Sequence, residues 1–80
     1  MSGIEQLLII ARRYAEIEKV PLSTVSSRVF NDGKKLRALE GGADISVGRF
    51  EQAVRWFSLN WPTGAPRPDV GLANFEEAHV

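Results

Sequence analysis

Apolar side chains recur at helical spacing through most of the chain, and turn-forming residues separate the segments in which they do so. From Ile4 onward an apolar residue returns every three or four positions, which places these residues on one face of a helix. Pro21 disfavours helical backbone at the residue before it. We therefore expect a first helix from Ile4 to about Lys19, with an inward stripe of Ile4, Leu7, Leu8, Ala11, Tyr14 and Ala15.

A second, shorter helix is predicted directly after Pro21, which suits the first turn of a helix. Val25 and Val29 are four residues apart and share one helical face, so we expect the helix to cover 22–30. The run Asn31-Asp32-Gly33 then favours a turn and left-handed backbone.

The third predicted helix spans 32–39, with Asp32 as its N-cap. Leu36 and Leu39 are three residues apart and give it a buried face. Gly41-Gly42 ends it, because glycine adopts left-handed backbone at little cost. Its outward side is basic and carries Lys34, Lys35 and Arg37.

A fourth helix is predicted from Ser46, its cap, to Trp61, where Pro62 closes it. Ile45 before the cap is placed to pack on Phe50 as a hydrophobic staple. The expected inward stripe consists of Val47, Phe50, Val54, Phe57 and Trp61.

Trp56 falls outside that stripe, beside Leu59, so we expect it to point outward. An outward tryptophan can lie under the tail, lie in a contact with another chain, or be exposed. Because tryptophan is enriched at interfaces, the contact is the interpretation we favour, with Phe75 of the tail as a further member.

The segment 62–68 has three prolines and one glycine in seven residues, which predicts an extended linker. Beyond it Leu72, Phe75 and Val80 are too few apolar residues for a core, so the tail is either disordered or docked. The expected organisation is an all-α domain of four short helices over 1–61, followed by a linker and acidic tail over 62–80.

Composition adds limits to this picture. Eighty residues make one small domain, and the chain has no cysteine with which to form a disulfide or a thiolate metal site. The longest apolar run, 7–11, is far too short to cross a membrane, and the N-terminus lacks a signal-peptide pattern. We expect a cytoplasmic protein with no membrane association.

Catalytic chemistry finds no support in the residues. His79 is the one histidine, and a lone histidine in a tail offers neither a triad nor a metal site. The glycines lack the spacing of a phosphate-binding loop. We expect a non-enzyme with no metal and no cofactor.

Charge is unevenly distributed although its sum is zero. Residues 1–61 hold nine Lys or Arg and seven Asp or Glu, whereas residues 62–80 hold Arg67 against three acidic residues. The helical part is therefore slightly basic and the tail acidic, a distribution that is compatible with nucleic-acid binding.

Residues 4–60 resemble the helix-turn-helix domain of the lambda-repressor and Cro-like family. That family has a small residue between apolar residues in the first helix of the motif, then a turn, a cap and two apolar residues three apart. Here these positions are Val25, Ser26, Val29, Asp32, Leu36 and Leu39. The resemblance continues through Glu40-Gly41-Gly42 to an amphipathic fourth helix, and it departs at the turn, where Phe30-Asn31 stands in place of glycine and an apolar residue.

The resemblance implies a recognition helix over about 32–40 that lies in the major groove of duplex DNA. Its base-reading residues would be Gly33, Lys34, Arg37 and Ala38, with Lys35 on the same basic helix. Thr24 and Arg49, near the starts of the second and fourth helices, would contact phosphate, because helix N-termini attract anions.

A second register resembles the Lac-repressor headpiece, through Val20-Pro21-Leu22-Ser23-Thr24-Val25-Ser26. Its recognition helix would be 22–30, read through Ser23, Ser27 and Arg28. That register requires buried, apolar side chains at Glu18 and Arg28, and a charge buried without a partner is costly.

Two functions from different classes are therefore expected. The first is a sequence-specific transcriptional regulator that binds duplex DNA as a homodimer, with Trp56, Leu59 and Phe75 in the dimer contact. The second is a protein-interaction module on the same fold, such as an antitoxin or anti-activator, which binds a protein partner through the fourth helix and the tail.

Overall fold

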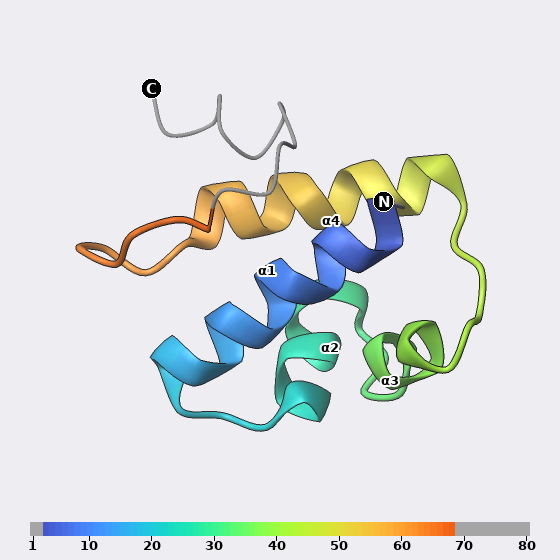
Figure 1. The fold of residues 1–80 in the computed structure, drawn as a ribbon, viewed down its shortest axis with the longest axis horizontal. Helices are drawn as coiled ribbons and strands as arrows, with labels where there is room; N and C mark the ends of the chain where they lie inside the picture. Colours follow the sequence, from blue (N-terminus) through green and yellow to red (C-terminus); the bar gives the residue numbers. More distant parts are fainter. Residues whose placement is uncertain (1–2, 69–80) are drawn as a thin grey trace.

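The computed structural model describes residues 3–68, and within that range the chain is all-helical (Figure 1). Helix α1 contacts each of the other helices, and α2 also contacts α3 and α4. The sequence therefore predicts the fold class correctly. The four helices are α1 (Gly3–Glu18), α2 (Leu22–Phe30), α3 (Lys35–Glu40) and α4 (Val47–Asn60).

Helices α1 and α2 end where the sequence predicts. Lys19 has a φ of 57°, and the Val20 N–H donates to the Ala15 carbonyl at 3.1 Å, which closes α1 with a left-handed residue. Asn31 has the same φ after α2, and its N–H donates to the Ser27 carbonyl at 2.9 Å. Both caps are non-glycine residues in a conformation that glycine usually takes.

Helix α3 begins three residues later than the sequence predicts. The Asp32 carboxylate accepts a hydrogen bond from the Lys34 N–H at 2.9 Å, and the Asp32 carbonyl accepts one from the Lys35 N–H at 3.3 Å. Asp32 therefore caps a turn that precedes α3 rather than the helix itself. Helix α3 has six residues, and Gly42, with a φ of 102°, follows its end.

Helix α4 has the predicted cap but not the whole predicted stripe. The Ser46 hydroxyl accepts a hydrogen bond from the Arg49 N–H at 3.2 Å. Val54 and Phe57 are buried and Phe50 is half-buried, as expected. The prediction for Val47 is wrong, because its side chain is 74% exposed at the first turn of the helix.

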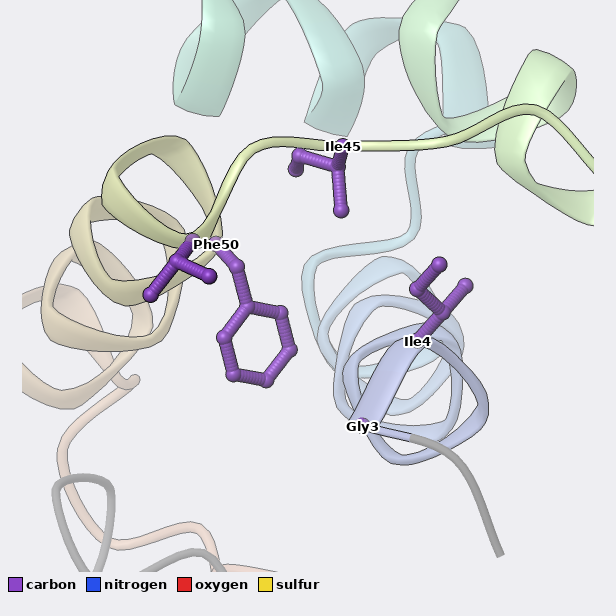
Figure 2. Close-up of a pocket in the computed structure, with 5 residues that line it drawn as sticks. Gly3, Ile4, Ile45 and Phe50 are labelled. Carbon is purple, nitrogen blue, oxygen red and sulfur yellow. The ribbon is translucent and has the colours of Figure 1, made fainter.

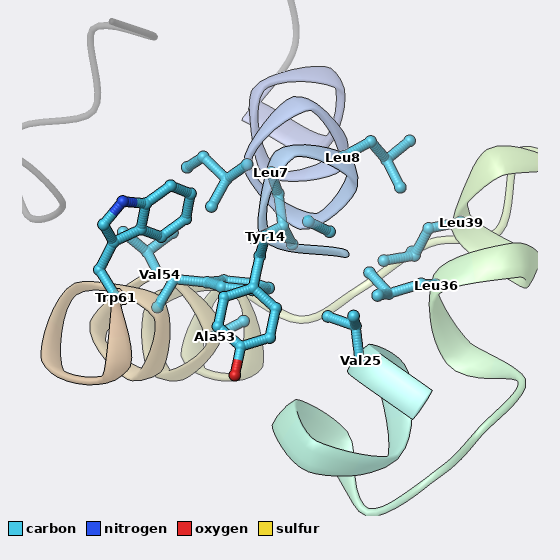
Figure 3. Packing of buried hydrophobic residues seen from close by; sticks show 12 residues of the cluster. Leu7, Leu8, Tyr14, Val25, Leu36, Leu39, Ala53, Val54 and Trp61 are labelled. Carbon is cyan, nitrogen blue, oxygen red and sulfur yellow. The ribbon is translucent and has the colours of Figure 1, made fainter. Parts of the chain in front are cut away.

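The core fills the space between the four helices (Figure 3). Tyr14 lies at its aromatic end, with its ring 5.6 Å from the Phe57 ring and 6.1 Å from the Trp61 ring. The buried apolar residues are Leu7, Leu8, Ile10, Ala11, Tyr14, Val25, Leu36, Leu39, Ala53, Val54, Phe57 and Trp61.

The segment 62–68 turns back over α4, so the prediction of an extended linker is wrong. The Ala65 N–H donates to the Pro62 carbonyl at 3.2 Å, and Gly64 has a φ of 84°. The Trp61 indole N–H donates to the Ala65 carbonyl at 3.2 Å, and the Arg67 guanidinium donates to the Ser58 carbonyl at 2.9 Å. These bonds satisfy polar groups at the end of α4 and hold the segment against it.

Trp56 does not point outward as the sequence predicts. It is half-buried, and its ring lies 5.5 Å from the Tyr14 ring in an edge-to-face arrangement. The indole extends from α4 to Tyr14 of α1. A large aromatic side chain can reach a neighbouring helix even when its Cα lies outside the apolar stripe. Leu59, in contrast, is 70% exposed.

Trp56→Ala is expected to lower the free energy of unfolding by about 2 kcal/mol, roughly half the loss seen when a fully buried tryptophan is truncated. Leu59→Ala, on the same helix, is expected to change it by less than about 0.5 kcal/mol, as for other exposed positions. Urea denaturation followed by circular dichroism measures both. Equal midpoints for Trp56→Ala and the unchanged protein would contradict the contact with Tyr14.

Candidate nucleic-acid interface

The buried hydroxyl of Ser26 joins α2 to the turn and to α3. Ser26 is 0% exposed. Its Oγ accepts a hydrogen bond from the Leu36 N–H at 3.0 Å and donates one to the Asp32 carbonyl at 2.6 Å. One small side chain thus satisfies backbone groups from both sides of the turn and fixes α3 against α2.

The pattern of burial fits the register in which α3 is the second helix of the motif. Val25, Leu36 and Leu39 are buried at its apolar positions, and the small buried residue is Ser26. The Lac-headpiece register needs Glu18 and Arg28 buried, whereas both are exposed. The region from Tyr14 to Lys19, its first helix, is the end of the sixteen-residue α1.

Glu18 and Arg28 instead form an ion pair on the surface. The Arg28 guanidinium donates to a Glu18 carboxylate oxygen at 3.0 Å and to the Tyr14 hydroxyl at 3.1 Å. The bond to Tyr14, followed by the one to Glu18, raises the pKa of Arg28 above its ordinary value. Arg28 therefore serves the α1–α2 contact, which reduces its availability for reading bases.

Lys34 and Arg37 are the predicted base-reading cations, and both are exposed. They are three residues apart, at the last residue of the turn and in α3. Within residues 3–68 neither side chain has a hydrogen-bonding or ion-pair partner. Ala38 is also exposed, so the surface next to these cations is not crowded by a long side chain.

Lys35 and Gly33 have structural contacts that the sequence did not predict. The Lys35 ammonium donates to the Asp44 carbonyl at 3.1 Å and ties the start of α3 to the loop that follows it. A Cβ at Gly33 would lie 3.1 Å from the Ser27 hydroxyl, so glycine lets the turn approach α2 closely. Both residues are half-buried.

Arg49 and Thr24, the predicted phosphate contacts, lie near the same motif, but their backbone N–H groups already donate hydrogen bonds within the protein. The Arg49 guanidinium lies 5.6 Å from the centre of the Phe30 ring, which brings the start of α4 to the end of α2. The Arg49 N–H donates to Ser46, and the Thr24 N–H donates to the Pro21 carbonyl at 3.0 Å. Any contact with phosphate therefore depends on their side chains.

The acidic residue at the end of α3 is neutralised on the side that faces α1. The Arg12 guanidinium donates two hydrogen bonds to the Glu40 carboxylate, at 2.9 and 3.2 Å. This pair is partly exposed and contributes at most about 1 kcal/mol to stability. Because Glu40 pairs with Arg12, Arg37 is the exposed charged side chain of α3 that has no ion-pair partner within residues 3–68.

Two serines of α2 belong to the same surface. Ser23 and Ser27 are four residues apart and exposed. The Ser23 carbonyl and the Ser27 hydroxyl lie within 3.6 Å of the position that a Gly33 Cβ would take. Sequence reasoning placed them only in the competing register, although their spacing already puts them on one face of the helix.

The predicted chain-to-chain contact is only partly described. Trp56 packs against Tyr14 of its own domain, and Leu59 remains exposed. Phe75 lies outside the described residues, as do the rest of the tail and His79. Within residues 3–68 no group of acidic or histidine side chains is arranged to hold a metal ion, and no helix is long and apolar enough to cross a membrane.

Comparison with known proteins does not identify a relative. No protein-family model, no curated protein and no solved structure matches the chain.

Proposed function

We propose that the protein binds duplex DNA in a sequence-specific manner and regulates transcription, with α2, the turn and α3 as its reading unit. The observation that carries this proposal is the fixed position of Lys34 and Arg37. Both side chains are exposed on a turn and a helix that Ser26 holds against α2 through two hydrogen bonds. Helix-turn-helix proteins present their base-reading residues in this way.

Base reading in this proposal belongs to α3 and the turn before it. Lys34 and Arg37 donate to guanine O6 and N7 in the major groove, the commonest specific contact of these side chains. Ala38 contributes an apolar methyl group suited to the methyl of thymine. Gly33 serves mainly the close packing of the turn on α2.

Phosphate contacts come from side chains around the motif. The ring of Phe30 supports the Arg49 guanidinium, whose N–H groups remain able to bind a phosphate oxygen. Thr24, Ser23 and Ser27 offer hydroxyl donors on α2. Such contacts set the position of the protein on the duplex and carry no sequence information of their own.

A homodimer on a two-fold operator follows from the size of the motif. A single small module buries only about 600–1,000 Å² on DNA, so two copies are needed for high affinity. Leu59, 70% exposed on α4, is the described residue best suited to the contact between copies. Leu59→Arg is the variant that tests this contact, and sedimentation velocity measures it.

Binding to a library of genomic fragments across a salt series is the experiment that tests the proposal. We expect a small set of fragments to be enriched, with an affinity that falls steeply as salt rises, because bound phosphates release counterions. Equal, weak binding to every fragment would contradict sequence reading. The lack of any binding at low salt would favour the second function, a protein-interaction module that acts through α4 and the tail.

A further inference from the structure

An apolar pocket lies between the N-terminal ends of α1 and α4 (Figure 2). It has a volume of about 230 Å³. An aromatic ring fits such a space, since a cavity of roughly 150 Å³ is enough for benzene. The residues that line it are Gly3, Ile4, Ile45, Val47 and Phe50.

The pocket is a built feature of the fold. Ile45 and Phe50 lie on either side of the Ser46 cap in the sequence, and both are half-buried against the core. A Cβ at Gly3 would lie 3.0 Å from the Phe50 ring, so glycine allows α1 to approach this ring. Val47 is exposed at the rim, which leaves an apolar surface that no residue of the described chain covers.

The direction of the chain after α4 leads back toward this pocket. Residues 62–65 form a turn, and the Arg67 guanidinium then donates to the carbonyl of Ser58, two residues before the end of α4. Figure 1 shows the described chain ending over α4 after this reversal. The next residues therefore start beside Ser58, on the same helix whose first turns line the pocket.

The length of the chain matches the distance that remains. Ser58 and Phe50 are eight residues apart, which is about 12 Å along a helix at roughly 1.5 Å per residue. An extended chain covers about 3.3 Å per residue, so five residues after Arg67 suffice to bring Leu72 level with Phe50. Leu72 and Phe75 are three residues apart in the sequence, a spacing at which a helical turn would place both side chains on one face.

We propose that Leu72 and Phe75 of the same chain dock into the pocket between α1 and α4. The side chains that line the pocket are all apolar. After Pro68, and apart from Val70, Leu72 and Phe75 are the first large apolar residues of the chain. Docking removes their surface and that of Val47 from water. In this arrangement Phe75 packs on the domain of its own chain. Leu59 is then the residue that remains for the proposed contact between two copies. The proposal is independent of DNA binding.

A disulfide trap tests the proposal in the full chain. The protein has no cysteine, so Val47→Cys/Phe75→Cys introduces the only two thiols. A disulfide needs Cα atoms about 4.4–6.8 Å apart, and we expect rapid formation of an intramolecular bond in dilute protein under mild oxidation. Leu59→Cys/Phe75→Cys is the control, because Leu59 is exposed on the same helix, about 18 Å from Val47 at the helical rise per residue. We expect it to oxidise at least about tenfold more slowly, the ratio that 1.4 kcal/mol of preference gives.

Non-reducing electrophoresis separates the possible outcomes. A monomer cross-linked faster than the control supports docking within the chain. A cross-linked dimer shows that the pocket receives the tail of a second copy, and equal rates in the two pairs show that the tail does not occupy the pocket. Either of these last two results overturns the proposal.

A second measurement covers the case in which the cysteines disturb the site. The methyl resonances of Ile4 and Ile45 are expected to shift in Phe75→Ala, because an aromatic ring beside them is lost. They are expected to stay in place in His79→Ala, a matched change in the same tail. Unchanged Ile4 and Ile45 resonances in Phe75→Ala would contradict docking.

Discussion

Lys34→Ala/Arg37→Ala is expected to weaken binding to the preferred DNA site by about 30-fold to 10⁴-fold, since each base contact contributes about 1–3 kcal/mol. Both side chains are exposed and lack a side-chain partner within residues 3–68, so their removal leaves the fold unchanged. Binding to unrelated DNA is expected to fall much less. Fluorescence anisotropy with specific and scrambled duplexes at one salt concentration measures both effects.

Arg13→Ala/Arg55→Ala is the matched control for that experiment. It removes the same number of charges from exposed positions on α1 and α4, away from α3. We expect it to reduce binding to specific and scrambled duplexes alike, and only slightly at 150 mM salt, where the screening length is about 8 Å. If the control weakens specific binding as much as the α3 variant does, the protein binds DNA by overall charge and the assignment to α3 fails.

Ser26→Val is expected to lower the free energy of unfolding by about 4 kcal/mol. The change leaves the Leu36 N–H buried without an acceptor, which costs about 1–3 kcal/mol. It also adds a methyl group where there is no space, which costs about 1–3 kcal/mol more. Chemical denaturation at equilibrium measures the loss, and specific DNA binding is expected to fail at temperatures at which the native protein still binds.

Ser27→Val makes the same chemical change at the adjacent position of α2. Ser27 is exposed, so a larger side chain has room on the solvent side of the helix. We expect its free energy of unfolding to stay within about 0.5 kcal/mol of that of the native protein. A loss in Ser27→Val equal to that in Ser26→Val would mean that valine disfavours α2 itself and that the bridging hydroxyl contributes little.

The sequence predicts the fold where local signals and packing agree. Helix α2 has the predicted bounds because Pro21 starts it and Asn31 accepts left-handed backbone at its end. The start of α3 is missed because Asp32 can cap either a helix or a turn, and its carboxylate bonds to Lys34 in the turn. Only the position of α3 against α2 decides between these two local solutions.

Errors on α4 have a different origin. Helical periodicity gives the direction of a side chain but not whether another element covers it. Val47 lies on the face that periodicity predicts to be buried, yet no residue of the described chain lies over it. Trp56 lies on the face that periodicity predicts to be exposed, yet its long side chain reaches the Tyr14 ring.

The sequence predicts the exposed cations of the candidate site but not the contacts that hold the surrounding residues in place. Lys34 and Arg37 stand out because they follow a turn and flank the apolar Leu36. The diversion of Lys35 to the Asp44 carbonyl and the pairing of Glu40 with Arg12 join residues 9 and 28 positions apart. No spacing rule within one helix reveals such contacts.

The brevity of α3 has a consequence for the surface that carries Lys34 and Arg37. A helix of six residues is far below the roughly 12–15 residues at which an isolated helix becomes even marginally stable. It exists only while Leu36 and Leu39 are packed against α1 and α2 and the Ser26 hydroxyl accepts the hydrogen bond from the Leu36 N–H. The cationic surface therefore forms and melts together with the whole domain. We therefore expect a proteolytic fragment that contains only α2, the turn and α3 to lack a formed α3, and we expect the proposed DNA binding to be lost on heating together with the global fold.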